Sequence, residues 1–440
     1  MKRRVFLSGG AGTAGVALFG IPRGLAATSD ALEMHPSSKS ANPDEIAGWN
    51  VPHDVEVEIV RVTNLNTHGA GSLREALQRA DIPESVYRVV VFDVSGRIDL
   101  GGHILRANQN RTIVAGQTAP GPIEIWGHTF QARQASEQLF MHLAFRGGKS
   151  VPGDSWQVDN VTKARFQNCS GANSVDEMMS FNNTVSDQVC LVDCLIGFQL
   201  FDTERGDHRF GPLVRNTNTR IGFYRNFFVG ARRGMPRLEN SCTVSFASNV
   251  FVSSGDNPAA KISSVPVVLE EKSEWPPTMA VDLFQNEYIW RNRRRLAQMD
   301  NDIGVVTTMY ERDNFIRPTY SAIGQRIRSK PANGAVQVDT VQMPPGARLV
   351  QVDEALPFVL VHAGMRPAQR DSTDAMIVSE VVAEDIVTRY DAVDDPPPAI
   401  QRVFTPRLDW SQKDGQGRSN ALVELDILHG ELGGVTRWVH

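Results

Sequence analysis

The sequence has little cysteine, no large excess of charge of either sign and no long apolar run, and each shortage excludes a class of protein. Four cysteines among 440 residues cannot build the disulfide framework of a small secreted scaffold. Cys190 and Cys194 stand in an apolar stretch, which predicts buried free thiols on one face of a strand, with zinc ligation as the alternative. The 45 basic and 50 acidic residues leave a formal net charge of -5, which argues against a nucleic-acid partner.

The first residues have the pattern of an export signal. Paired arginines within Lys2–Leu7 precede a Gly- and Ala-rich apolar stretch, Ser8–Ile21, and then small residues at Ala26 and Ala27. A bilayer span takes ~20 apolar residues, so this run is too short to stay in a membrane, and a short buried helix or an anchor is the alternative. We predict a twin-arginine-type signal peptide over residues 1–28 and a periplasmic or secreted protein without membrane attachment after its removal.

A weak internal repeat in the middle of the chain indicates the fold class. Asn168 and Asp193 lie 25 residues apart, and Asn226 and Asn249 lie 23 apart; the longer interval between these pairs is consistent with a loop inserted into one coil. Each of these four residues ends a segment in which apolar and polar residues alternate, a pattern that predicts a strand. Asn tolerates the left-handed backbone of a tight corner. A recurrence in the low twenties is typical of a parallel β-solenoid whose stacked coils share one core. A two-sheet β-sandwich is the alternative.

The flanking segments complete the predicted organisation. Residues 29–52 are predicted to form a polar linker, and residues 53–385 the all-β solenoid domain. Gly71–Gln78 predicts a short helix, capped by a serine with a glutamate three residues on, that closes the open end of the solenoid. Residues 386–440, which contain a run of three prolines, are predicted to be an extended segment that wraps and packs on the solenoid.

Several segments together resemble the pectate lyase family, the calcium-dependent β-helix enzymes that cleave pectin. They are Val62–Leu65, Gly71–Ala76, Val91–Gly96, Ala115–Gly121, Phe140–Arg146, Val175–Glu177 and Val361–Pro367. The resemblance covers roughly residues 55–385 and is poor over about 265–350. The family members that the chain resembles are exported bacterial proteins. It implies a right-handed parallel β-helix with a substrate groove on one outer sheet. It also implies β-elimination, in which the C5 proton of a uronate is removed and the C4 oxygen departs.

Two aspartates are the candidate metal ligands. Asp154 and Asp176 are 22 residues apart, about one coil, which places them on one face of adjacent coils at ~5 Å. The resemblance implies that they hold Ca²⁺, which takes oxygen ligands and makes the C5 proton of a bound uronate more acidic. Glu177 and Asp159 are weaker candidates. Taken alone, such aspartates are more often solvated turn residues.

An arginine cluster supplies the other candidates. Arg232, Arg233 and Arg237 follow a predicted solenoid strand closely, a pattern that favours polyanion binding over a solvated turn of ion pairs. The resemblance implies an arginine base, for which Arg233 and Arg237 are the candidates. It implies substrate contacts for Arg232, His208 and Arg209.

The chain also departs from the family pattern. Gln167 and Asn168 replace an Asp-His pair, and Gly234 stands where the base is expected. Either the base has shifted to Arg233, or the activity is weak, altered or lost. Three functions therefore remain open: a monomeric lyase of an acidic polysaccharide, a non-catalytic carbohydrate-binding solenoid, and a glycoside hydrolase that uses two carboxylates.

Overall fold

The computed structural model describes most of the chain beyond the predicted signal and linker. The described residues are 32–34, 49–149, 153–182, 186–200, 210–215, 220–231, 237–239, 242–253, 268–270, 278–289, 300–301, 306–317, 325–326, 336–337, 348–386 and 391–435. No helix within these residues is long and apolar enough to cross a membrane.

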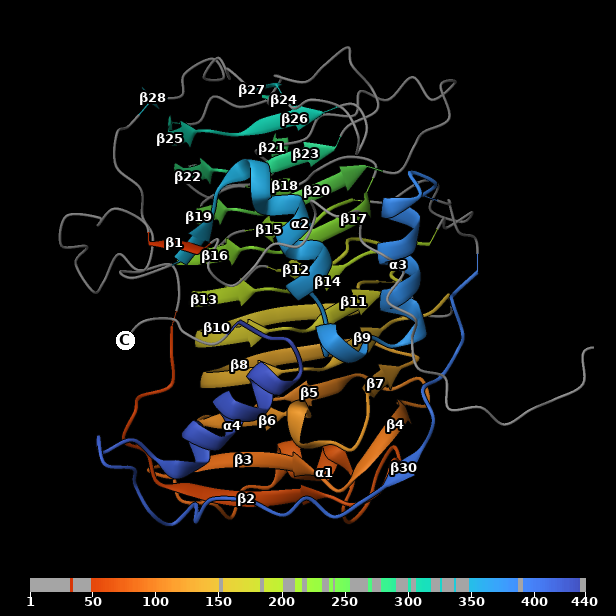
Figure 1. Ribbon diagram of the computed structural model, residues 1–440, viewed down its shortest axis with the longest axis vertical. Coiled ribbons are helices and arrows are strands. Elements are labelled where there is room, and N and C mark those ends of the chain that lie inside the picture. Colours follow the sequence, from red (N-terminus) through yellow and green to blue (C-terminus); the bar gives the residue numbers. More distant parts are fainter. Residues whose placement is uncertain are drawn as a thin grey trace, which may run out of the picture.

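Most of the chain forms a column of parallel strands in which each coil visits three sheets in turn (Figure 1). One coil contributes β12 (Ser180–Phe181), β13 (Asp187–Val192) and β14 (Leu195–Ile196). The chain then returns to the first sheet as β15 (Leu213–Arg215), which pairs in parallel with β12. The parallel β-solenoid predicted from the repeat is therefore confirmed.

Each sheet is defined by its strands in stacking order. The first sheet contains β5 (Leu105–Ala107), the first half of β8 (Phe130–Met141), the first half of β10 (Trp156–Gln167), β12, β15, β18 (Arg237–Glu239), β21 (Val268–Glu270) and β24 (Asp300–Asn301). The second contains β2 (Val57–Val62), β3 (Tyr87–Phe92), β6 (Thr112–Ala115), the second halves of β8 and β10, β13, β16 (Arg220–Tyr224), β19 (Cys242–Ala247), β22 (Thr278–Phe284), β25 (Val306–Arg312) and β28 (Val336–Gln337). The third contains β4 (Val94–Asp99), β7 (Ile123–Trp126), β9 (Ala144–Arg146), β11 (Ser170–Ala172), β14, β17 (Phe227–Ala231), β20 (Val250–Ser253), β23 (Glu287–Ile289) and β26 (Phe315–Arg317).

A few short strands that pair antiparallel and two single helical turns lie around the column. They are β27 (Gln325–Arg326) on β26, β30 (Ile400–Gln401) on β4, β1 (Leu32–Met34) with β29 (Arg348–Val350), and the single turns η3 (Gly116–Thr118) and η5 (Pro367–Gln369).

The interior of the column is filled by apolar side chains that stack from coil to coil. Phe140 and Phe166 stack with ring centroids 4.7 Å apart, and Phe223 and Phe246 with centroids 4.4 Å apart. Because every second side chain of a strand points inward, an aromatic residue at the same register in successive coils meets its equivalent directly. Burying one such side chain contributes roughly 1.5–3 kcal/mol, so these stacks hold the coils in register.

The corner between the second and third sheets uses the left-handed backbone that the repeat predicts. Asn168 and Asp193 have φ angles of 47° and 53°. In the later coils, however, the left-handed residues are Arg225 and Ser248, with φ angles of 56° and 55°. The predicted alignment of the repeat is therefore wrong by one residue in these coils, because the recurring asparagine follows the left-handed position there and does not occupy it.

These asparagines instead build a buried ladder parallel to the column. Nδ2 of Asn226 donates to Oδ1 of Asn249, Asn249 donates to Asn286, and Asn286 donates to Asn314, each over 3.0 Å. The backbone N–H of Cys194 donates to Oδ1 of Asn226 over 2.9 Å and ends the series. The ladder satisfies buried backbone groups in successive coils, which is the condition for placing polar side chains inside a core.

Helix α1 (Leu73–Gln78) closes the lower end of the column, as predicted. The hydroxyl of Ser72 accepts a hydrogen bond from the backbone N–H of Glu75 over 3.2 Å, which satisfies one of the free donors at the start of the helix. Leu73, Ala76 and Leu77 are buried in the column's core. The helix thus covers apolar surface that no further coil would cover.

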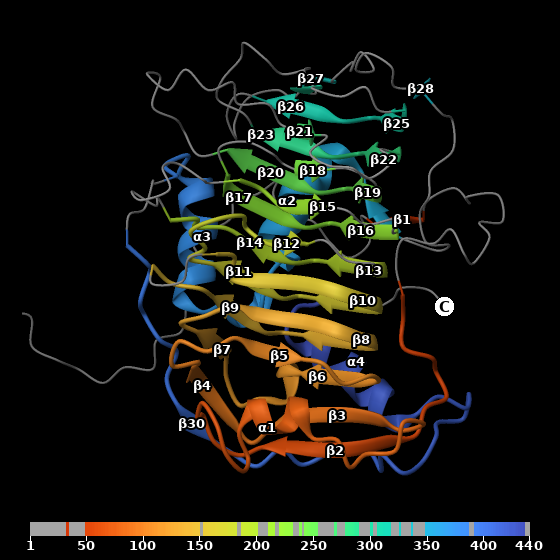
Figure 2. The ribbon, with the colours of Figure 1, turned by 180° about the vertical axis from the view of Figure 1, so that it is seen from behind.

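Three further helices, which the sequence patterns did not predict, lie against the outside of the column. They are α2 (Val352–His362), α3 (Ser372–Val382) and α4 (Asn420–Glu431). Helices α2 and α3 pack on the third sheet, and α4 packs on the second sheet near its lower end. From the opposite side the strands are uncovered by these helices (Figure 2).

The cysteines behave as predicted in one respect and not in another. Cys169, Cys190 and Cys194 are buried and free, which confirms the prediction of buried thiols. Cys190 lies in β13 and Cys194 lies beyond the corner at Asp193, so the two do not share one face of a strand.

The ladder predicts the stability of one variant. Asn249→Ala removes the acceptor of two hydrogen bonds from Asn226, and two unsatisfied buried donors cost roughly 2–6 kcal/mol. We expect the urea midpoint to fall accordingly, whereas Asn108→Ala at an exposed position shifts it little. Equal midpoints for the two variants would contradict a stabilising role for the ladder.

Candidate functional site

Asp154 lies at the edge of the first sheet, two residues before β10 begins. Trp156 at the start of β10 points into the core, where its ring lies 4.8 Å from that of Phe145. The carboxylate of Asp154 instead faces the outer side chains of the sheet: the hydroxyl of Ser180 contacts Oδ2, and Nε2 of Gln157 donates to the same atom over 3.3 Å. The strand that anchors Trp156 therefore fixes the position of this carboxylate.

Asp154, Asp176 and Glu177 form an acidic cluster, in which one carboxylate oxygen from each lies within 4.8 Å of the others. The spacing of Asp154 and Asp176 predicted this proximity. Asp154 and Glu177 are 3% and 7% exposed. Burial, with a further contribution from the charge of Asp176, raises the pKa of Asp154 to about 6. Burial and then the two neighbouring carboxylates raise the pKa of Glu177 to about 9. Three carboxylates this close need a counter-charge or protons.

Arg237 supplies a positive charge beside the cluster. It begins β18, and its Nη1 donates to Oε1 of Glu177 over 3.2 Å. Its guanidinium lies 4.9 Å from the ring centre of Phe210, a residue that bridges in parallel to Glu177. Arg237 is only 8% exposed, so its orientation toward the cluster is set by packing as well as by charge.

The other predicted residues lie elsewhere. His208, Arg209, Arg232 and Arg233 fall outside the described residues. Asp159 lies on the first sheet but outside the acidic cluster, where it accepts a hydrogen bond from Nε2 of a neighbouring glutamine, Gln131, over 2.9 Å.

Gln167 and Asn168, which depart from the family pattern, lie at the end of β10 and on the corner beyond it. Asn168 donates through Nδ2 to the carbonyl oxygens of His362 and Gly364 over 2.7 and 3.1 Å, and so fastens the segment after α2. Gln167 lies against His429 of α4. Both residues attach the C-terminal region and neither contacts the acidic cluster.

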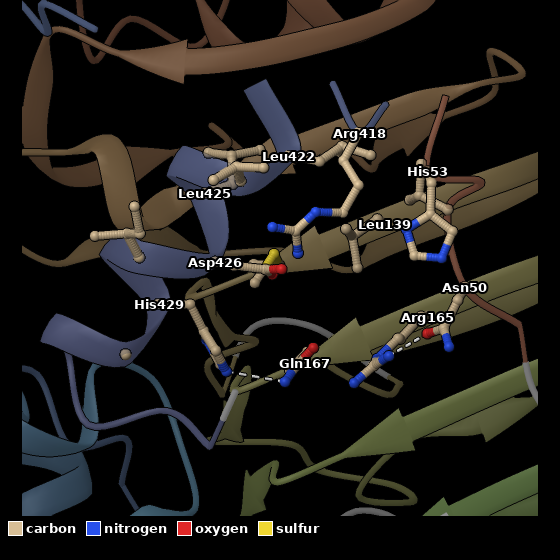
Figure 3. Close-up of a pocket in the computed structure, with 15 residues that line it drawn as sticks. Asn50, His53, Leu139, Arg165, Gln167, Arg418, Leu422, Leu425, Asp426 and His429 are labelled. Carbon is tan, nitrogen blue, oxygen red and sulfur yellow. Dashed lines mark hydrogen bonds between the residues drawn. The ribbon is translucent and has the colours of Figure 1, made fainter. Parts of the chain in front are cut away.

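A separate cavity of about 490 Å³ opens between α4, the second halves of β8 and β10, and residues 50–53 (Figure 3). Burial lowers the pKa of Arg165 to about 10, and this side chain also contacts Oδ1 of Asn50. Across the cavity, burial raises the pKa of Asp426 in α4. No sequence pattern predicted this cavity, because its lining comes from four segments that are far apart along the chain.

Two buried histidines connect α4 to the column beside this cavity. The backbone N–H of Arg366 donates to Nδ1 of His142 over 3.1 Å, so the proton of His142 is on Nε2. That nitrogen lies 2.8 Å from Nδ1 of His429 and donates to it. The proton of His429 is then on Nε2, which lies 2.9 Å from Nε2 of Gln167. The Gln167 amide accepts this proton when it is turned over so that its oxygen faces the ring.

A column of parallel coils with a buried acidic cluster and an arginine on one outer sheet defines the class: a β-solenoid with a candidate cation site. No family model matches the chain. Curated relatives include the probable pectate lyase C of Aspergillus terreus, 29% identical over 247 residues that are 55% of this chain and 52% of the relative. The probable pectate lyase C of Aspergillus flavus is 24% identical over 347 residues, 76% of this chain and 75% of the relative.

The chain thus spans about half the length of the first of these relatives and three quarters of the other. Among solved structures, a pectate lyase from Bacillus sp. N165 in complex with trigalacturonate aligns with a TM-score of 0.49 and 9% identity, over 72% of this chain and 96% of that one. The curated relatives confirm the resemblance to pectate lyases that the sequence motifs indicated.

The histidine pair predicts a pH dependence of stability. Burial first, and then the charge of neighbours, lowers the pKa of His142 well below 6.5 and that of His429 to about 3. The unfolded chain therefore binds more protons, and this stability is present above pH 6.5 and is lost as the pH falls toward 3.

We expect His429→Gln to lower the urea midpoint at neutral pH and to flatten its decline between about pH 7 and pH 5. His103→Gln, at an exposed position, should keep the wild-type decline. An unchanged slope in His429→Gln would refute the role of the pair.

Proposed function

We propose that the protein is a polysaccharide lyase that cleaves a uronate polymer, pectate foremost, by calcium-assisted β-elimination. The observation that carries this proposal is the acidic cluster of Asp154, Asp176 and Glu177, with Arg237 beside it, on an outer sheet of the solenoid. The names of the curated relatives support the choice of pectate.

The acidic cluster fits a calcium ion by the chemistry of its donors. Ca²⁺ takes six to eight oxygen ligands, many of them carboxylates, in flexible geometry. The raised pKa values of Asp154 and Glu177 mean that the cluster is more stable when its negative charge is neutralised. Asp154, Asp176 and Glu177 would hold the ion, which when bound would withdraw electron density from a uronate carboxylate and make the C5 proton more acidic.

The two candidate arginines then take different roles. A guanidinium that donates to a carboxylate is stabilised in its protonated form, as Arg237 does with Glu177. Arg237 therefore suits the binding of a uronate carboxylate and the stabilisation of the developing negative charge. Arg233, four residues before it on the other side of Pro236 in sequence, is left as the proposed base that takes the C5 proton.

The same pairing favours a second candidate function. Because the pairing of Arg237 with Glu177 keeps that arginine protonated, a site in which no other arginine acts as the base would bind a uronate polymer without cleaving it. A glycoside hydrolase would need two carboxylates across the scissile bond, which Asp176 with Asp154 or Asp207 could supply. Asp207 lies outside the described residues, and the crowding of Asp154, Asp176 and Glu177 within 4.8 Å of one another suits a shared cation better.

The remaining parts of the proposal concern residues that the structure does not describe. His208, Arg209 and Arg232 are proposed to contact the polymer. Residues 1–28 are proposed to be a twin-arginine-type signal that directs a monomeric protein to the periplasm or the medium.

The first test is the calcium dependence of cleavage. Polygalacturonate with calcium should yield unsaturated products that absorb in the ultraviolet, and a chelator should abolish them. Asp154→Asn should lower kcat/KM by about 100-fold or more, since a metal supplies several kcal/mol of charge stabilisation. Asp159→Asn, on the same sheet but outside the cluster, is the matched control and should stay near the wild type.

Three outcomes would decide between the candidates. Reducing ends without the unsaturated chromophore would point to hydrolysis and overturn elimination. Binding without any product would leave only the non-catalytic candidate. Full activity in the presence of chelator would exclude the metal role of the cluster.

A second test separates the roles of the arginines. Arg237→Lys keeps the charge but loses the two-pronged geometry, so we expect kcat/KM to fall about tenfold, and Arg237→Gln to fall by a further factor of about ten. Arg233→Lys should abolish turnover while leaving the affinity for polygalacturonate close to the wild type. Turnover in Arg233→Lys with none in Arg237→Lys would reverse the assignment.

A further inference from the structure

The cavity between α4 and the second sheet has the size of a ligand site. Its volume is about 490 Å³, and sites for small molecules typically measure about 300–1,000 Å³. Side chains from the second halves of β8 and β10 form its floor, and α4 and residues 50–53 form its walls (Figure 3). The acidic cluster belongs to the first sheet, so the function proposed for that cluster leaves this cavity without a role.

Arg165 is the charged group on the floor of the cavity. Its neighbours Ala164 and Phe166 lie in the column's core, so the alternation along β10 turns the side chain of Arg165 outward. Nη1 contacts Oδ1 of Asn50 on the wall, and the residue is only 6% exposed. Burial lowers its pKa to about 10, which leaves it protonated at neutral pH. A strand therefore presents a buried positive charge in a setting where water screens it little.

Asp426 is the one carboxylate among the described residues that line the cavity. Burial raises its pKa, and three basic groups oppose this rise, which places them near it: Arg165, Arg418 and His53. Nε of Arg418 also donates to Asp414 over 2.8 Å, so part of that charge is offset outside the cavity. The described lining is thus richer in basic than in acidic groups, which favours an anionic ligand.

The rest of the lining suits an apolar body. Leu139 of β8 pairs with Arg165 of β10, and Leu422 and Leu425 contribute apolar surface from α4. Burial lowers the pKa of His429 to about 3, so this ring adds no charge at neutral pH. A buried charge beside apolar walls is the combination that holds and orients a small molecule.

We propose that this cavity binds a small organic acid, a carboxylate carried on an apolar or aromatic body. The two oxygens of a carboxylate match the planar fork of N–H donors that a guanidinium offers, so the carboxylate would lie at Arg165. The body would lie against Leu139, Leu422 and Leu425, surfaces that disfavour the hydroxyl groups of a sugar. The inference goes beyond the proposed function and does not depend on it.

The first test is calorimetric titration of the whole protein at about pH 7 with four probes. Phenylpropionate carries a carboxylate on an apolar body, and phenylpropionamide has the same shape without the charge. Galacturonate carries a carboxylate on a polar body, and inorganic phosphate is an anion without a body. We expect phenylpropionate to bind and each of the others to bind about tenfold more weakly or worse. Failure of phenylpropionate to bind, or equal binding by any of the other three probes, would overturn the inference.

Two variants then locate the site. Arg165→Met keeps the length of the side chain and removes its charge, so we expect the affinity for phenylpropionate to fall about tenfold or more. Asp426→Asn removes a carboxylate that would repel the ligand, so the affinity should rise by about threefold. Arg402→Gln, at an exposed arginine outside the cavity, is the control and should match the wild type.

The variants also name the outcomes that contradict the site. Unchanged affinity in Arg165→Met would place the carboxylate elsewhere, and weaker binding in Asp426→Asn would mean that the cavity selects a cationic or zwitterionic ligand. Either result would overturn the inference. Circular dichroism checks that each variant folds. Should Arg165→Met fail to fold, the comparison of the acid with its amide in the wild type decides.

Discussion

In-register parallel pairing of β8, β10 and β12 is the constraint on which the rest of the molecule depends. It repeats each position of the chain at about 4.8 Å, so residues one coil apart in sequence become neighbours whatever their charge. Asp154 and Glu177 are brought together in this way, and the fold accepts two buried carboxylates that repel each other. This register therefore creates the acidic cluster, and a bound cation would offset the repulsion between its carboxylates.

The column tolerates this repulsion because its other contacts hold the coils firmly. Phenylalanine stacks such as Phe140 on Phe166 and the buried ladder through Asn226 and Asn249 fix the register from inside. Helices α2, α3 and α4 cover other faces and leave the acidic cluster's sheet to face outward. Asp154 lies only two residues before β10, so this strand, anchored in the core by Trp156, restricts the position of its carboxylate, as a preorganised site requires.

The sequence predicted the features that depend on spacing along the chain. The period of the repeat indicated the solenoid, and the interval of 22 residues between Asp154 and Asp176 indicated that they meet. Features that depend on the register between strands were missed or misplaced. Loops of unequal length hid the continuation of the ladder to Asn286 and Asn314. Helix α4 shows no pattern that identifies the face it packs on.

The most direct measurement of the central claim is a crystal structure of the protein with calcium and trigalacturonate. A calcium ion among Asp154, Asp176 and Glu177, with a uronate carboxylate completing its ligands and Arg237 within hydrogen-bond distance of the sugar, is the result expected. An acidic cluster without the ion, or an oligosaccharide held in the cavity beside α4 and absent from the first sheet, would contradict it.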